Sequence, residues 1–221
     1  MRLLALVCWF LLMAQGAAGE TAPPRVGLVL SGGGARGIAH IGVLQVLEEQ
    51  RVPIGFIAGT SMGAVVGGLY ATGYSPAELE TIVTEMDWPD IFEDEPPRAK
   101  LPFRRKQDDL NFLSSLRIGV KDGGIAIPRG VVQGQKLNLV LSRLLLHVSQ
   151  VEDFSGLRLP FAAVSTDIVT GEAVVHESGD LATALRASMS IPGVFEPIEM
   201  DGRLLVDGFV SNNIPIDLAL A

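Results

Sequence analysis

Cysteine is almost absent from the 221-residue chain, which contains Cys8 alone, so the fold depends on no internal disulfide. Histidine is also scarce, with three residues, which leaves few candidates for a histidine base. The 17 basic residues are outnumbered by 25 acidic ones, which gives a net charge of −8. This charge argues against nucleic acid as a partner, because phosphate contacts need a basic surface. It also argues against attachment to anionic lipid by charge over the whole surface.

The first 19 residues have the pattern of a secretory signal peptide. Arg2 gives a positive start, residues 3–13 form a continuous apolar stretch, and small residues follow at 14–19. The stretch is too short for a membrane-spanning helix, and an uncleaved anchor is the alternative. Cleavage would remove Cys8, and a mature chain without a thiol suits an oxidising compartment. We therefore expect an exported protein, either secreted or associated with the periplasm or outer membrane.

Residues 20–221 have the length and composition of one globular domain, because 48% of the chain is hydrophobic and 19% is charged. Residues 25–30 predict a buried strand, a glycine-rich loop follows, and helical spacing of apolar residues begins at Ile38. A second strand begins at Pro53, and this order is typical of a parallel α/β unit. The later pattern predicts helices that begin at residues 76 and 215 and others at 133–148 and 181–187, with strands at 123–130, 161–166, 173–176, 197–200 and 203–206.

Residues 59–63 read Gly59-Thr60-Ser61-Met62-Gly63, the G-x-S-x-G pattern of a nucleophile elbow. An apolar run precedes them and a run of small residues follows, which is the strand–turn–helix context that such an elbow needs. Glycine at both flanks allows the strained backbone at the serine to pass close to its neighbours. A plain tight turn is the alternative, but the context favours Ser61 as a nucleophile at a helix N-terminus.

The glycine-rich loop contains Gly32, Gly33 and Gly34 at the start of a helix, and it has three interpretations. With Gly37 it fits the G-x-G-x-x-G pattern of a dinucleotide site, but that site needs an acidic residue at the end of the next strand. Ser61 and its neighbours occupy that position instead. Backbone N–H groups of this loop suit an oxyanion hole for acyl transfer, and a tight turn without a ligand is the third interpretation.

A serine nucleophile needs a base, and two partners for Ser61 are conceivable. The chain order Ser61, Asp167, His176 fits an α/β-hydrolase triad, but both partners lie in a turn-rich hairpin. Asp207 is favoured, because it follows a buried strand and Gly208 lets the backbone turn sharply. A simple Asx turn is the alternative role for Asp207.

The helical periodicity fails between Asp87 and about Leu110. Acidic residues cluster in the first part of this segment, and basic residues are interleaved with Leu101 and Phe103 in the second. A basic and apolar loop of this kind could make transient contact with a lipid surface. A solvated loop in which the two charge clusters pair is the alternative.

Five stretches of the chain together resemble the patatin-like phospholipases, in their bacterial secreted branch. They are GGGARG at 32–37, AHIGVL at 39–44, GTSMG at 59–63, ASMSIPGVF at 187–195, and VDG at 206–208 followed by NNIP at 212–215. They occur in the order typical of the family, from about residue 25 to the C-terminus.

The resemblance implies a three-layer α/β/α sandwich with a mainly parallel central sheet. It implies a Ser61–Asp207 dyad without histidine, and an oxyanion hole from the backbone of Gly32, Gly33 and Gly34, with Arg36 supporting that loop. The expected reaction is hydrolysis of phospholipid or lysophospholipid esters through an acyl-enzyme, with no metal and no cofactor.

Two features depart from the family pattern. Phe209 follows Asp207-Gly208 where the family has glycine or alanine, and the chain ends 14 residues after Asp207. We therefore expect residues 20–221 to be a C-terminally incomplete domain of a longer precursor, which in some secreted relatives carries an outer-membrane barrel. A catalytically silent lipid-binding module and a nucleotide-binding protein are the competing hypotheses.

Overall fold

The computed structural model describes residues 25–93, 98–104, 106–107, 119–121, 124–126 and 130–220. The signal peptide expected at residues 1–19, the domain start at residue 20 and part of the charged 87–110 segment lie outside these ranges. None of the helices within them combines the length and the apolar character needed to span a bilayer.

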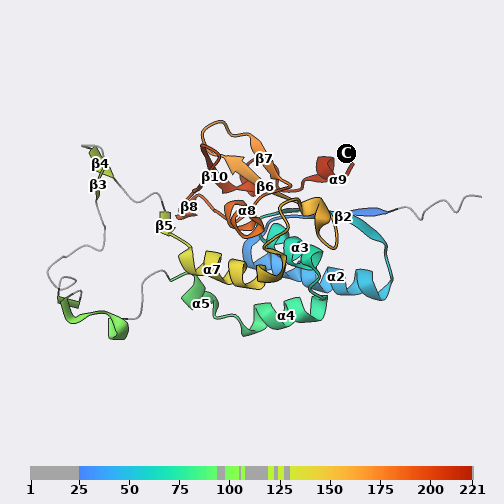
Figure 1. Ribbon diagram of the computed structural model, residues 1–221, viewed down its shortest axis with the longest axis horizontal. Helices are drawn as coiled ribbons and strands as arrows, with labels where there is room; N and C mark the ends of the chain where they lie inside the picture. Colours follow the sequence, from blue (N-terminus) through green and yellow to red (C-terminus); the bar gives the residue numbers. More distant parts are fainter. Residues whose placement is uncertain are drawn as a thin grey trace, which may run out of the picture.

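A six-stranded sheet forms the centre of the molecule (Figure 1). Its pairings run β1 to β2 to β6 in parallel, and β6 then pairs with β7 and β10 in antiparallel fashion. Because β9 is antiparallel to β10, four strands run one way and two the other, so the sheet is mainly parallel as predicted. The strands are β1 (Val26–Leu30), β2 (Ile54–Thr60), β6 (Phe161–Asp167), β7 (Ala173–His176), β9 (Ile198–Met200) and β10 (Arg203–Asp207).

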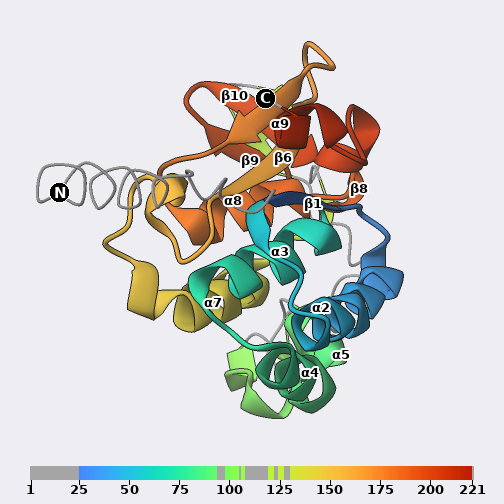
Figure 2. The same ribbon diagram turned by 90° about the vertical axis from the view of Figure 1, so that its right-hand side faces the viewer.

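Helices cover both faces of this sheet. The helix α3 packs against β2 and β6, and Gly67 allows a close approach of α3 to Leu30 and Ile57. On β1, Gly27 lies on the opposite face from Leu30 and contacts Ala219 of α9. Figure 2 shows α9 on the other side of β1 from α2, α3 and α4. Among the described residues, most helices therefore lie on one face and the short helix α9 lies on the other, in the predicted order of helix, sheet and helix.

Further elements complete the described chain. The helices are α2 (His40–Glu49), α3 (Met62–Thr72), α4 (Pro76–Glu85), α5 (Trp88–Ile91), α7 (Gln135–Leu144), α8 (Leu181–Ser188) and α9 (Ile216–Leu220). The 3-10 helices are η2 (Gly34–Ala39), η3 (Arg98–Lys100), η4 (Leu146–Val148), η5 (Phe154–Gly156) and η6 (Gly208–Val210). Two small sheets pair β3 (Gly119–Lys121) with β4 (Gly124–Ala126), and β5 (Gly130–Val132) with β8 (Gly193–Phe195).

Local signals in the sequence set several helix starts. Ser75 and Glu78 form a reciprocal capping box before Pro76 at the start of α4. The side chain of Asp180 accepts the N–H of Thr183 at 2.7 Å and caps α8. The structure differs from the prediction after the glycine loop, where a 3-10 segment precedes α2, and at the end of α7, where a 3-10 turn follows Leu145.

Candidate active site

The ends of β2 and β10 meet beside the middle of β6. The strand β7 pairs with one edge of β6 along the stretch where β2 and β10 also pair with it, so β2 and β10 share the other edge. On that edge Thr60 lies opposite Val164, and Asp207 lies opposite Ser165, the next residue of β6. Because β2 is parallel to β6 and β10 is antiparallel, the two strands point at each other. Ser61 follows Thr60, so the register brings Ser61 to Asp207.

The backbone at Ser61 has the conformation of a nucleophile elbow. Its φ of 56° and ψ of −126° fall in a region of backbone conformation that residues other than glycine rarely adopt. Ser61 is also the N-cap of α3. The N–H of Ser61 donates to Ser188 Oγ at 2.8 Å, and Ser188 Oγ donates to the carbonyl of Val164 at 2.5 Å. The strained serine is therefore anchored to α8 and β6 by one continuous pair of hydrogen bonds.

Asp207 ends β10 and is fully buried, with 0% of its surface exposed. Its Oδ1 accepts the N–H of Phe209 at 3.0 Å, and its own N–H donates to the carbonyl of Ser190 at 2.9 Å. Burial raises the pKa of the Asp207 carboxyl, because desolvation disfavours its charged form, while hydrogen bonds from Ser61 and Phe209 act in the opposite direction. A buried carboxylate with a raised pKa is a better proton acceptor than an exposed one.

The Ser61 hydroxyl donates to Asp207 Oδ2 at 2.6 Å. Both side chains are buried, since Ser61 is only 4% exposed, and the short distance is typical of a charge-assisted O–H···O bond. The structure thus brings together the two side chains that the sequence pairs as a dyad.

The three histidines are engaged elsewhere. Nε2 of His176 lies 2.7 Å from Ser165 Oγ on β6, and burial lowers the pKa of His176. Nε2 of His40 lies 2.9 Å from the carbonyl of Ser31, and His147 contacts the carbonyls of Leu144 and Thr72. Ser61 is therefore bonded to Asp207 and not to His176, so the structure does not form the triad Ser61, Asp167, His176.

Close packing at the two strand ends leaves no room for side chains at three glycines. A Cβ on Gly59 would lie 2.6 Å from Cα of Ala64, and a Cβ on Gly63 would meet the carbonyl of Leu30. A Cβ on Gly208 would meet the carbonyl of Val164 on β6. These obstacles are backbone atoms that cannot rotate away, so each glycine allows a close approach beside Ser61 or Asp207.

The glycine loop lies directly against the nucleophile. A Cβ on Gly32 would be 2.9 Å from Cβ of Ser61, and the N–H of Gly32 donates to Asn213 Oδ1 at 3.1 Å. Within the described residues, the N–H groups of Gly33 and Gly34 have no hydrogen-bond partner. Arg36 closes the loop through its backbone N–H, which donates to the carbonyl of Gly33 at 3.2 Å, while its side chain is exposed.

Several residues that support the site were not singled out from the sequence. Arg186 is almost fully buried, and its Nη1 donates to Ser190 Oγ at 2.7 Å, while the carbonyl of Ser190 accepts the N–H of Asp207. Ser188 holds the N–H of Ser61. Arg186, Ser188 and Ser190 all lie in or just before the ASMSIPGVF stretch. The match of that stretch to a family pattern was the signal available in the sequence, but the pattern did not indicate what each side chain does.

Phe209, the first departure from the family pattern, leaves the site intact. Its N–H is bonded to Asp207, and its side chain is 48% exposed. The aromatic ring therefore does not replace the Ser61–Asp207 contact.

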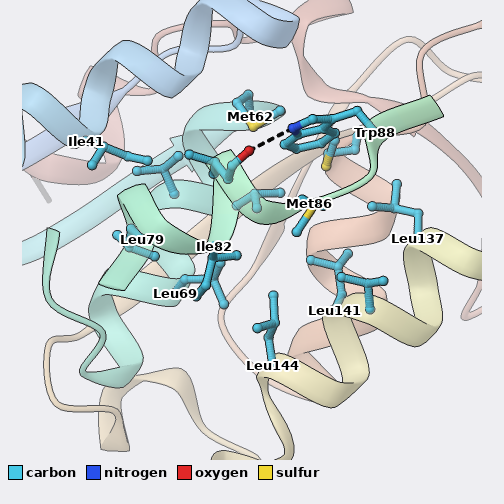
Figure 3. A pocket seen from close by; sticks show the side chains of 15 residues that line it. Ile41, Met62, Leu69, Leu79, Ile82, Met86, Trp88, Leu137, Leu141 and Leu144 are labelled. Carbon is cyan, nitrogen blue, oxygen red and sulfur yellow. Dashed lines mark hydrogen bonds between the residues drawn. The ribbon is translucent and has the colours of Figure 1, made fainter. Parts of the chain in front are cut away.

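An apolar cavity of about 30 Å³ lies among α2, α3, α4, α5 and α7 (Figure 3). Met62 and Met189 line it, and these are the residues that follow Ser61 and Ser188 in the chain. The rest of its wall is aliphatic except for Met86 and Trp88, and the Nε1–H of Trp88 is bonded to the carbonyl of Val83 at 2.9 Å. The cavity therefore lies within the helical layer, one residue along α3 from Ser61, and offers apolar surface alone.

An α/β sheet with a serine elbow and an adjacent buried aspartate defines a class of candidate hydrolase sites. The chain belongs to the patatin-like phospholipase family, whose family model matches residues 28–220. An uncharacterised NTE family protein of Mycobacterium tuberculosis is 37% identical over 193 residues, which cover 87% of this chain and 45% of that protein. Lysophospholipase NTE1 of Mycosarcoma maydis is 34% identical over 198 residues, which cover 89% of this chain and 9% of that protein.

Human patatin-like phospholipase domain-containing protein 6 is also 34% identical, over 88% of this chain and 12% of that protein. Among solved structures, VipD from Legionella pneumophila matches with a TM-score of 0.55 and 18% identity, over 88% of this chain and 47% of VipD. This structural likeness shows the fold alone. The chain spans less than half the length of these relatives.

Proposed function

We propose that the protein is a serine acyl-ester hydrolase that releases fatty acids from phospholipids or lysophospholipids. The observation that carries the proposal is the 2.6 Å hydrogen bond from the Ser61 hydroxyl to the buried carboxylate of Asp207, at a nucleophile elbow. Family membership supports the substrate class, and one of the relatives is named as a lysophospholipase.

In the proposed reaction, Ser61 Oγ attacks the carbonyl carbon of the acyl ester, and the hydroxyl proton passes to Asp207 Oδ2. The negative oxygen of the tetrahedral intermediate is stabilised by backbone N–H groups of the glycine loop. When the intermediate collapses, the C–O bond to the alcohol breaks and Asp207 returns the proton to that oxygen. Water, deprotonated by Asp207, then attacks the acyl carbon. The bond from that carbon to Ser61 Oγ breaks, the fatty acid leaves, and Asp207 returns the proton to Oγ.

A carboxylate can serve as the base because of its surroundings. Burial raises the pKa of Asp207 and so brings its basicity closer to what proton transfer at neutral pH requires. The same burial limits competing contact with water, which strengthens the interaction of Asp207 with the serine proton.

The apolar cavity beside Met62 and Met189 is the proposed inner end of an acyl-chain site. Its wall is wholly apolar, which suits a hydrocarbon and not a headgroup, but its volume of about 30 Å³ is far below the roughly 300 Å³ of a typical ligand pocket. A bound acyl chain would therefore have to widen it, and the flexible side chains of Met62 and Met189 are suited to that movement.

We also propose that the protein is exported, on the basis of the signal-peptide pattern at residues 1–19. N-terminal sequencing of protein recovered outside the cytoplasm of a bacterial host tests this. A new N-terminus after Ala18 or Gly19 supports export, and a chain that retains residues 3–13 inside the cell contradicts it.

The function is tested with the complete chain and vesicles of phosphatidylcholine or micelles of lysophosphatidylcholine. Released fatty acid is measured by mass spectrometry for the wild type, Ser61→Ala and the exposed helix-surface control Ser142→Ala. We expect release by the wild type and Ser142→Ala, and none by Ser61→Ala. Lipid binding that survives Ser61→Ala, with no release by any folded variant, would instead identify a silent lipid-binding module.

A further inference from the structure

The side chain of Asn213 reaches the glycine loop from the opposite end of the chain. Its Oδ1 accepts the N–H of Gly32 at 3.1 Å, although the two residues are 181 positions apart. A Cβ on Gly32 would lie 2.7 Å from Asn213 Oδ1 and 2.9 Å from Cβ of Ser61. Gly32 is therefore held between the amide of Asn213 and the nucleophile.

The segment that carries Asn213 is fixed to the strands that carry the candidate dyad. The carbonyl of Asn212 accepts the Thr60 hydroxyl at 2.9 Å, at the end of β2. The hydroxyl of Ser211 lies 2.7 Å from Oγ1 of Thr166, which also donates to the carbonyl of Asp207 at 3.1 Å. Because its two preceding neighbours are anchored in this way, Asn213 is presented to the loop from a rigid base.

The contact with Asn213 divides the N–H groups of the loop into two kinds. Gly32 is committed to Asn213, whereas within the described residues Gly33 and Gly34 have N–H groups without a partner. A hydrogen bond to Gly32 fixes the plane of the peptide between Ser31 and Gly32. It thereby restricts the orientation of the peptides that follow.

We propose that Asn213 is a positioning residue for the oxyanion hole, which holds the glycine loop through Gly32 so that the N–H groups of Gly33 and Gly34 face the substrate oxygen. This inference rests on the proposed function. The sequence resemblance implies three donors, Gly32, Gly33 and Gly34. The inference reduces them to two, because the N–H of Gly32 binds Asn213 and only Gly33 and Gly34 remain to donate to the substrate oxygen. Asn213 itself does not contact the reacting atoms.

If Asn213 has this role, its substitution should lower the rate only for substrates whose carbonyl oxygen is stabilised by the oxyanion hole. Asn213→Ala and Asn213→Leu remove the acceptor for Gly32, and Leu keeps most of the volume. We expect kcat for p-nitrophenyl butyrate to fall about tenfold with KM nearly unchanged, because an oxyanion donor acts in the transition state. The matched control is Asn212→Ala, which removes a side-chain bond to Asp217 and leaves the Gly32 contact in place.

The decisive readout is the ratio of kcat/KM for the ester to kcat/KM for the corresponding thionoester. Sulfur is a larger and weaker hydrogen-bond acceptor than oxygen, so the thionoester gains little from the hole. We expect the ratio to fall about tenfold in both Asn213 variants and to stay at the wild-type value in Asn212→Ala. Both rates scale with the amount of folded enzyme, so partial unfolding does not change the ratio.

An equal loss on both substrates would overturn the positioning role and leave Asn213 as a purely structural residue. Unchanged rates in both Asn213 variants would overturn it as well. A folded wild type that hydrolyses neither substrate would overturn the proposed function, and the inference with it, which is distinguishable because the failure appears before any substitution at Asn213.

Discussion

The two strand ends that meet at the candidate active site hold their side chains by different means. At the end of β2, Ser61 is positioned by its backbone, with φ at 56° and glycines packed against main-chain atoms on both sides. At the end of β10, Asp207 has an ordinary φ of −52°, and hydrogen bonds and full burial position it. The nucleophile therefore depends mainly on the shape of its backbone, with one hydrogen bond to Ser188, whereas the carboxylate depends mainly on burial and hydrogen bonds.

This difference predicts different responses to substitution. Changes beside Ser61 that add atoms should reduce stability, because the backbone has nowhere to move. Changes at Asp207 that keep its shape should reduce the rate and leave the fold intact.

The largest effect is expected for Asp207→Asn, which keeps the shape of the side chain and removes its basicity. We expect kcat/KM for an acyl ester to fall about 10³-fold, because general-base assistance is lost. Steady-state hydrolysis of p-nitrophenyl butyrate measures this, and circular dichroism confirms the fold. A folded Asp207→Asn variant within tenfold of the wild type would assign the base to another group.

Gly63→Ala tests the backbone side of the comparison. Its Cβ would collide with the carbonyl of Leu30, so we expect the free energy of unfolding to fall by about 3 kcal/mol. Gly42→Ala in α2 is the matched control, because nothing lies within 4 Å of the added carbon, and it should stabilise the fold by about 0.5–1 kcal/mol. Urea denaturation measures both, and equal stabilities for the two variants would contradict the steric role of Gly63.

Ser188→Ala removes the acceptor for the N–H of Ser61 without adding any atoms. Leaving that buried N–H unpaired should lower the free energy of unfolding by about 2 kcal/mol. Ser142→Ala on the exposed surface of α7 should change it by less than about 0.5 kcal/mol. Chemical denaturation of both variants measures the difference, which would vanish if Ser188 did not anchor the elbow.

The smallest effect expected is a pH-dependent gain in stability from Asp207→Asn. The raised pKa of Asp207 means that the folded state holds this proton more tightly than the unfolded state does. The wild type should therefore lose stability as the pH rises from the unfolded pKa of about 3.9 through the raised folded pKa. Asp207→Asn should be more stable than the wild type at neutral pH, with the difference shrinking towards acidic pH. Urea denaturation of both proteins at neutral pH and at about pH 4 measures the difference in the free energy of unfolding. The same difference at the two pH values would contradict this linkage.

Local patterns in the sequence were sufficient for most elements and for both members of the candidate dyad. The capping box at Ser75, the cap at Asp180 and the alternation of strands and helices depend on neighbours in the chain. Ser61 was identifiable for the same reason, since an elbow needs its glycines within two residues. Asp207 was identifiable as an aspartate at a strand end followed by glycine.

The supporting contacts could not be predicted because they depend on the register of distant strands. The ends of β2 and β10 meet because of the particular residues of β6 with which each strand pairs. The hydrogen bonds from Ser61 to Ser188 and from Gly32 to Asn213 join residues 127 and 181 positions apart. A sequence motif identifies such residues as a group, but only the packed sheet shows which atom of each one is used.

Labelling by a fluorophosphonate probe tests most directly whether Asp207 activates Ser61. The rate of labelling would be measured at neutral pH for the wild type, Ser61→Ala, Asp207→Asn and His176→Gln, each checked for folding by circular dichroism. We expect no label on Ser61→Ala, a rate reduced by about 10²-fold or more for Asp207→Asn, and a rate close to the wild type for His176→Gln. A wild-type rate for Asp207→Asn combined with a loss for His176→Gln would show that the serine is activated by histidine and that the Ser61–Asp207 pairing is not the source of reactivity.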